Sequence, residues 1–418
     1  MTYHPFPGML AAPRLRLLRR IVVAVALLAA AGVHGGEPEA LAISENIRAR
    51  HMPFGTILDP VLDETGQSAG YSRCGDSAIW TGHYLAAEAL RYRVTADPQA
   101  LEGVRAALEG IRSLVEITGG SLLARCLVPV DSPFAEGILS EEAHHCQFRG
   151  TYRDRAYYWV GNTSRDQYSG VLFGLAVTFD MVAQDDVRWV ARELITRLLN
   201  GLTDRGWAVV MPDGRISTVF WHRPDQQLSF LQIGRHVNPE RFGWSYRFAR
   251  FWYAGAVSAP IAVEALDAHN YYYKFNLAAI NLFNLIRLED SGYYRGWFER
   301  AYQAFRQATS VHGNPHFDMI DHALRGPDAV RDAQVRVLLD DWLLRPRMDE
   351  WVDLRGRYPA CGQDERSCVV IPVPERVRTD FLWQRSPFQL LGGGSGRIEG
   401  AGIDYILPYW MARYYGVL

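Results

Sequence analysis

The sequence is almost without lysine: it has 44 basic side chains in 418 residues, and Lys274 is the only lysine among them. Arginine supplies the rest of the positive charge, so a single arginine says little about phosphate or carboxylate binding. The formal net charge is −2, which gives no electrostatic reason to expect nucleic acid as a partner. No apolar run after the first forty residues approaches the roughly 20 residues that a membrane-spanning helix needs.

Several catalytic motifs are also missing. The chain has no P-loop, no dinucleotide-binding glycine pattern and no His-Glu-x-x-His, which argues against nucleotide enzymes and zinc proteases. It has no Cys-x-x-Cys pair either, so the sequence predicts no zinc site. We therefore expect no metal and no cofactor.

The composition indicates a large folded domain, because 48% of the residues are hydrophobic and 12% are aromatic. At the N-terminus, arginines precede the apolar run Ile21–Ala31, and small residues follow, which is typical of a signal peptide over residues 1–36. We expect cleavage near Gly35 or Gly36 and a periplasmic or secreted protein. The alternative is an uncleaved membrane anchor. No linker divides residues 37–418, which we interpret as a single domain.

Five cysteines agree with an oxidising compartment. Cys126 and Cys146 bracket one loop, and Cys361 and Cys368 lie in another, so two local disulfides are the expected pairing. Cys74 is left over, and it is able to replace either partner in a pair.

A repeated unit of helix, short polar turn and helix organises the chain. Residues 77–94 are apolar on more than one side, which predicts an inner helix, and residues 98–118 carry one apolar stripe, which predicts an outer helix. Residues 119–164 are expected to form a long rim loop, and residues 207–221 a β-hairpin around Asp213-Gly214. Further helices are expected at 166–182, 186–202, 248–266, 276–288, 293–310, 315–324 and 328–344, with a last one near the C-terminus.

This arrangement resembles the six-hairpin (α/α)6 toroids of the glycosidase-like superfamily over roughly residues 70–416. The segments Gly-Asp-Ser-Ala-Ile-Trp-Thr-Gly, Arg-Asp-Gln-Tyr-Ser-Gly and Leu-Pro-Tyr-Trp-Met-Ala-Arg-Tyr-Tyr are also similar to those of uncharacterised secreted bacterial proteins, a resemblance that implies no reaction. The toroid resemblance implies an all-α fold with a minor β-hairpin and long rim loops. It also implies a cleft at the mouth of the barrel, where acids and aromatic side chains bind and cleave sugars.

Asp76, Trp80 and His83 are spaced i, i+4 and i+7, so a helix places them on one face. Asp76 is a candidate catalytic acid, with Trp80 and His83 as substrate-binding residues. The alternative is that Asp76 caps the following helix, an interaction of about 1 kcal/mol. Asp166 opens the second hairpin and is open to the same two interpretations.

Glu399 and Asp404 precede the last helix, which ring closure would bring beside the first hairpin. Both are candidate catalytic acids, and glycoside hydrolysis needs two carboxyl groups. Pro408 predicts a break or kink in that last helix. Further candidate substrate-binding residues are Arg125, Arg165, Tyr168, His316 and Trp383.

The first hypothesis is a secreted glycoside hydrolase that uses Asp/Glu general acid and base on an oligosaccharide or polysaccharide. The second is a polysaccharide lyase acting on a uronate-containing glycan, with Tyr168, His316 and Arg165 in its site. The third is a non-catalytic glycan-binding envelope protein. The membrane is expected as a partner only if the N-terminal segment is not cleaved.

Overall fold

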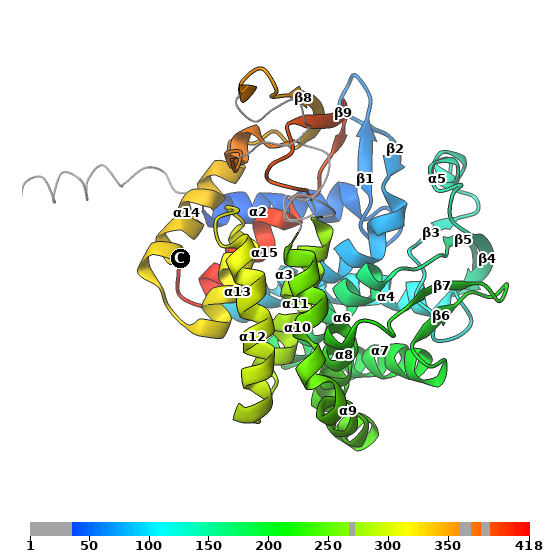
Figure 1. The fold of residues 1–418 in the computed structure, drawn as a ribbon. Helices are drawn as coiled ribbons and strands as arrows, with labels where there is room; N and C mark the ends of the chain where they lie inside the picture. Colours follow the sequence, from blue (N-terminus) through cyan, green and yellow to red (C-terminus); the bar gives the residue numbers. More distant parts are fainter. Residues whose placement is uncertain (1–35, 267–271, 360–368, 378–384) are drawn as a thin grey trace, which may run out of the picture.

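The structure is a computed structural model that describes residues 36–266, 272–359, 369–377 and 385–418. Within these residues the chain is mostly helical, with three small sheets (Figure 1). The predicted signal peptide, the cysteines at 361 and 368, and the candidate Trp383 lie outside the described residues. Among those described, no helix is long and apolar enough to cross a membrane.

Helices alternate between an inner one, buried along most of its length, and an outer one with a solvent-facing side. The predicted stripe on the first outer helix is confirmed, since Val104, Leu108, Ile111 and Val115 are all buried. The pairs are α3 (Ser77–Thr95) with α4 (Pro98–Glu116), α6 (Arg165–Met181) with α7 (Asp185–Asp204), α8 (Pro224–Val237) with α9 (Pro239–Tyr253), α11 (Tyr273–Arg287) with α12 (Gly292–Thr309), α13 (Pro315–Arg325) with α14 (Ala329–Leu343), and α15 (Ile403–Tyr414) with α2 (Glu37–Asn46).

Each inner helix contacts the next inner helix along the chain, and the last, α15, contacts the first, α3. Helix α2, from the start of the described chain, packs on α15 from its end, and Figure 1 shows these two close together. One hydrophobic core includes residues from Ala40 to Val417. Helix α15 continues through Pro408, so the predicted break is not observed there.

The closest helix contact is between α3 and α6, and glycine makes it possible. A Cβ atom on Gly82 would lie 2.2 Å from the carbonyl oxygen of Gly170, and one on Gly174 would lie 2.1 Å from the carbonyl oxygen of Gly82. No side chain fits between these backbones. The two helices whose N-termini carry Asp76 and Asp166 are therefore held at backbone-contact distance.

The structure contains more β structure than the single minor β-hairpin that the sequence predicts. The hairpin itself is confirmed, as β6 (Ala208–Val210) and β7 (Ile216–Val219). The predicted rim loop at 119–164 instead contains α5 (Ala135–Glu141) and a sheet in the order β3-β5-β4. A further sheet, in the order β2-β1-β9-β8, joins the two ends of the described chain. The strands are β1 (Asp59–Leu62), β2 (Ser68–Ser72), β3 (Cys126–Pro129), β4 (Gln147–Tyr152), β5 (Arg155–Val160), β8 (Met348–Asp353) and β9 (Leu391–Glu399).

Two other expectations are corrected. The helix predicted at 248–266 is divided into the end of α9, a short 3-10 turn at Ala254–Ala256 and α10 (Ser258–Ala265). Pro260 lies in the first turn of α10, where an N–H group would have no partner within the helix. The disulfide joins Cys126 to Cys74, not to Cys146, which is a buried free thiol.

Candidate functional site

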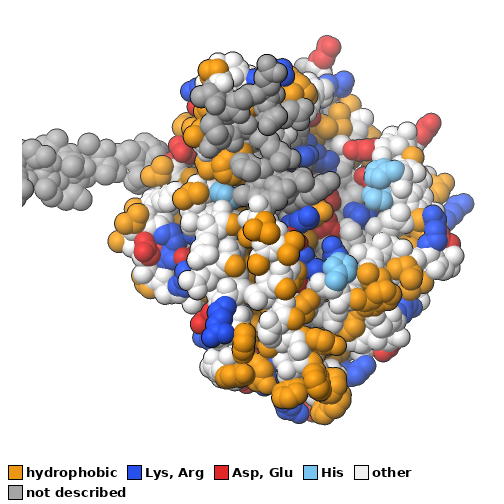
Figure 2. All heavy atoms as spheres, viewed as in Figure 1, with side chains coloured by type: hydrophobic (Ala, Val, Ile, Leu, Met, Phe, Trp, Pro, Cys, Tyr) orange, Lys and Arg blue, Asp and Glu red, His pale blue; other side chains and the backbone are white. Residues whose placement is uncertain are grey.

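The N-terminal ends of the inner helices carry a concentration of charged and polar side chains. Contacts between neighbours join these ends: Gln167 of α6 bonds Asp76 before α3, and Arg165 of α6 lies 2.7 Å from the Nε2 atom of His222 before α8. Figure 2 shows side chains of both charges, with histidines, around the depression between the part of the molecule with β8 and β9 and the part with α5 and β4. We call these helix ends the N-terminal rim.

Asp76 ends a short 3-10 turn, Cys74–Asp76, directly before α3. It occupies the N-cap position, yet its side chain makes no capping bond to the helix. The first-turn N–H groups bond elsewhere: that of Ala78 donates to the carbonyl oxygen of Arg125, and that of Ile79 donates to Gln167 Oε1 at 2.9 Å. The capping alternative for Asp76 therefore does not hold in this structure.

Gln167 connects the two candidate acids. Its side chain is fully buried, and its Nε2 group donates to Asp76 Oδ1 at 3.1 Å. Its backbone N–H donates to Asp166 Oδ1 at 3.0 Å, and that oxygen also accepts a bond from the hydroxyl of Ser164. Asp76 and Asp166 are thus bonded to opposite ends of one residue, and both are partly exposed.

Arg125 does not extend freely from the rim. Its guanidinium donates to the carbonyl oxygens of Gly75 and Asn162 and to the hydroxyl of Ser164, at 2.7 to 3.0 Å. These bonds tie the turn before α3 to the turn before α6. Arg125 therefore positions the segments that carry the two candidate acids.

Arg165, which is partly exposed, and His222, which is exposed, form a basic pair at the rim. Burial lowers the pKa of Arg165, and the neighbouring Arg223 lowers it further. His222 is exposed, and partial burial with the charges of Arg165 and Arg223 lowers its pKa. Arg223 itself is buried in an ion cluster with Asp225 and Glu264.

The remaining predicted binding residues of this region lie in the interior. Trp80 and Tyr168 are buried, and the Tyr168 hydroxyl accepts a bond from the N–H of Leu123. His83 is buried too, with Nδ1 2.8 Å from the Ile79 carbonyl oxygen, and burial lowers its pKa to about 4. His316 packs 6.2 Å from it, ring centre to ring centre, and burial places its pKa well below the usual value.

Glu399 and Asp404 lie at the junction of β9 and α15, where other side chains bind both carboxylates. The carboxylate of Glu399 binds Asn46, Arg50 and Arg347 at 3.1 to 3.4 Å. Asp404 accepts a bond from the Trp342 indole at 2.8 Å. Both carboxylates are buried, and these contacts fasten the last inner helix to the N-terminal and C-terminal segments.

The sequence interpretation did not single out Gln167, His222 or Arg223. Gln167 follows Asp166 directly, but its bond to Asp76 joins residues separated by 91 positions. His222 and Arg223 precede Pro224, a residue that commonly begins a helix. That proline is the one sequence signal that another inner helix begins here, directly after basic residues.

The chain matches no protein-family model, and comparisons with curated proteins and with solved structures gave no match. The case for a function therefore depends on the geometry of the chain itself.

Proposed function

We propose that the protein is an exported glycan-active enzyme with an (α/α)6 toroid fold, and that it is a glycoside hydrolase. The closed series of contacts from α3 through α6, α8, α11, α13 and back from α15 to α3 supports the toroid. In such a fold the rim formed by the inner-helix ends is the expected place for substrate. The apolar segment before residue 36, preceded by arginines, supports export to the periplasm or the exterior.

The observation that carries the proposal is the Asp76–Gln167–Asp166 arrangement. Two partly exposed carboxylates lie at the starts of adjacent inner helices, and one buried glutamine bonds both of them. Glycoside hydrolysis uses such a pair, in which one carboxyl group protonates the leaving oxygen and the other activates water or attacks the sugar carbon. The side chain of Asp76 does not itself cap α3; it accepts a bond from Gln167, whose side-chain oxygen accepts the N–H of Ile79.

Glu399 and Asp404 are better explained as structural acids than as catalytic ones. Each is buried and bound to arginine or to an indole, so their contacts fasten the chain. The proposed catalytic pair is therefore Asp76 and Asp166. In this proposal, Arg165 and His222 contribute to substrate binding.

A polysaccharide lyase is the second candidate, because of the accessible pair Arg165 and His222. A lyase needs a cation to neutralise a uronate carboxylate and a base to remove the neighbouring proton. Burial and the charges nearby lower the pKa of His222, so its imidazole is neutral and able to accept a proton at pH 7. The buried Tyr168 and His316 are poorly suited to these roles.

The test is to incubate the purified chain from residue 36 with neutral and uronate-containing oligosaccharides. Hydrolysis gives new reducing ends alone, elimination also gives the ultraviolet absorbance of an unsaturated uronate, and a binder gives neither. We expect hydrolysis, and we expect Asp76→Asn and Asp166→Asn each to lower kcat by about 100-fold or more. Azide rescue of one variant would identify the base or nucleophile.

Asp131→Asn is the matched control, because Asp131 is an exposed carboxylate after β3 that pairs with Arg155. We expect this variant to keep full activity. Full activity in both Asp76→Asn and Asp166→Asn would contradict the assignment of the site. If the products are unsaturated and His222→Ala abolishes their formation, the lyase proposal would replace the hydrolase proposal.

A further inference from the structure

A cluster of two histidines and a glutamate lies directly after α5, in the segment Glu142-Ala-His144-His145. The backbone N–H of Glu142 donates to the Ile138 carbonyl oxygen, and that of His145 donates to the Glu142 carbonyl oxygen. This turn folds the segment back on itself. As a result, one ligand-type atom from each of Glu142, His144 and His145 lies within 4.8 Å of the others.

The carboxylate of Glu142 is only half satisfied by the protein. Its Oε1 atom accepts a hydrogen bond from the N–H of Gly75 at 2.7 Å. Its Oε2 atom is buried and has no hydrogen-bond partner among the described residues, and the whole residue is only 4% exposed. The nearest basic group is His145 Nε2 at 3.6 Å. A buried carboxylate oxygen without a partner is costly, unless the site holds a ligand that supplies one.

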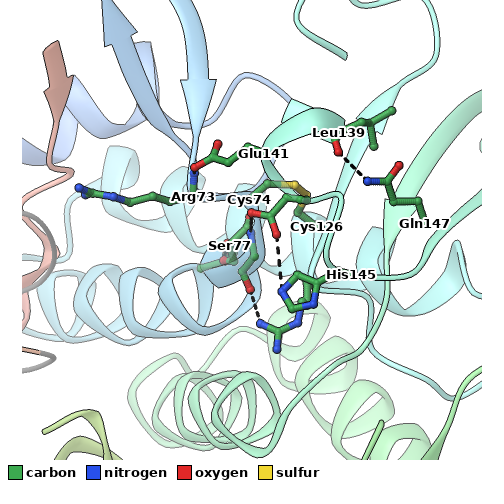
Figure 3. The surroundings of a disulfide bond; sticks show 12 residues. Arg73, Cys74, Ser77, Cys126, Leu139, Glu141, His145 and Gln147 are labelled. Carbon is green, nitrogen blue, oxygen red and sulfur yellow. Dashed lines mark hydrogen bonds and ion pairs between the residues drawn. A yellow bond between two sulfur atoms is a disulfide. The ribbon is translucent and has the colours of Figure 1, made fainter. Parts of the chain in front are cut away.

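The backbone around the cluster is fixed on both sides. Gly75 follows Cys74, whose disulfide to Cys126 ties the turn before α3 to β3. On the other side, the carbonyl oxygen of Cys146, next to His145, accepts the N–H of Gly161 at 2.7 Å. Figure 3 shows His145 beside the disulfide, and Glu141 on the other side of it, near Arg73. The disulfide and these backbone hydrogen bonds therefore hold the segments on both sides of the cluster in place.

We infer that Glu142, His144 and His145 bind a divalent transition-metal ion, with Zn²⁺ as the reference ion. Oε2 of Glu142 and one ring nitrogen from each histidine would be the protein ligands, and water would complete the coordination. Imidazole nitrogen with one carboxylate is a ligand set for zinc and similar ions, whereas Ca²⁺ and Mg²⁺ prefer oxygen alone. The Gly75 N–H, bonded to Oε1, orients the carboxylate from the second coordination shell.

The spacing agrees with this ligand set. Ligands about 2.0 to 2.1 Å from a tetrahedral zinc ion lie about 3.3 to 3.5 Å apart, and Glu142 Oε2 is already 3.6 Å from His145 Nε2. The rings of His144 and His145 are 4.0 Å apart, centre to centre. Because His144 is exposed, its side chain is able to rotate into place without moving the backbone. This inference is independent of the proposed glycan activity.

The experiment uses the chain from residue 36, with any affinity tag removed and metals stripped by a chelator. Titration calorimetry with ZnCl₂ should give one ion per chain, and Co²⁺ should give the visible absorption of a low-symmetry nitrogen and oxygen site. We expect His144→Ala, His145→Asn and Glu142→Gln each to weaken zinc binding by about tenfold or more. His144→Ala changes an exposed side chain, so it tests the site even if a buried variant fails to fold.

Glu141→Gln is the matched control, because the Glu141 carboxylate bonds Ser72 and the N–H of Arg73 instead of the cluster. We expect it to bind zinc with the affinity of the unaltered chain. Equal zinc affinity in His144→Ala would overturn the inference, as would the absence of stoichiometric zinc binding in the unaltered chain. Zinc should also raise the melting temperature of the unaltered chain and of Glu141→Gln, and at the same zinc concentration it should raise that of His144→Ala by less.

Discussion

Replacing Gly82 by alanine should separate the two helices that carry the proposed catalytic pair. The new Cβ atom would lie 2.2 Å from the carbonyl oxygen of Gly170, whereas ordinary contact begins at 3.4 Å. The obstacle is backbone in the middle of a helix, so no side chain is able to rotate away. Helices α3 and α6 must therefore move apart by about 1 Å in a closely packed core.

The expected cost follows from two opposing effects. Overpacking of a core costs about 1 to 3 kcal/mol, with backbone contacts at the upper end. Alanine in place of glycine inside a helix returns about 0.5 to 1 kcal/mol. We therefore expect Gly82→Ala to lower the free energy of unfolding by about 2 kcal/mol, with Gly174→Ala close to it. Because the same movement relieves both clashes, the double variant should cost less than the sum of the two.

The assay is denaturant unfolding followed by circular dichroism, together with the rate of glycan cleavage. Gly296→Ala is the matched control, because Gly296 lies inside α12 and a Cβ atom added there would meet no described atom within 4 Å. It should be neutral or slightly stabilising. If Gly82→Ala unfolds at the same denaturant concentration as Gly296→Ala, the backbone contact between α3 and α6 does not exist as described.

Three further predictions concern the interior. Burial lowers the pKa of His83 to about 4, so this side chain binds a proton more tightly in the unfolded chain than in the folded one. The free energy of unfolding should therefore fall by about 3 kcal/mol from pH 6.5 to pH 4. Equilibrium unfolding measured at several pH values should show a smaller fall for His83→Gln. Gln167→Met leaves the buried N–H of Ile79 without a partner, which should cost about 1 to 3 kcal/mol in denaturant unfolding and lower glycan turnover; unchanged turnover would contradict the bridging role. Cys74→Ser removes the disulfide that closes a loop of 52 residues, which should lower the free energy of unfolding by about 4 kcal/mol in the chain-entropy model. Cys146→Ser should change the melting temperature little. A larger loss of stability in Cys146→Ser than in Cys74→Ser would instead support the disulfide between Cys126 and Cys146.

The helical part of the fold was largely predictable because its signals are local. The predicted helix at 77–94 is observed as Ser77–Thr95, and that at 315–324 as Pro315–Arg325. Helix α8 was missed because much of its buried surface is polar, including Gln226, Ser229 and Gln232. An apolar period cannot be detected in such a helix, since the contacts that bury these side chains come from other helices.

The pairings of β9 were missed because they join segments that are distant in the chain. Strand β9 contains Gly392-Gly-Gly394-Ser-Gly396, a composition typical of a turn, yet it pairs with β8 and, through Ile398 and Val61, with β1. A Cβ atom at Gly393 would lie 2.2 Å from the carbonyl oxygen of Glu350. The glycine that weakens the strand signal in the sequence is therefore what allows β8 to approach.

The role of the candidate acid Asp76 also depends on contacts between distant residues, as a comparison with helix caps elsewhere in the chain shows. An aspartate before a helix predicts a cap, and at Asp97 and Asp328 the side chain does accept bonds from first-turn N–H groups. Asp76 has the same local sequence signal, but Gln167 from the neighbouring helix takes the capping role. Only a contact between distant residues distinguishes the two cases. The Asp76 carboxylate instead accepts a bond from the Gln167 side chain, and in our proposal it forms the catalytic pair with Asp166.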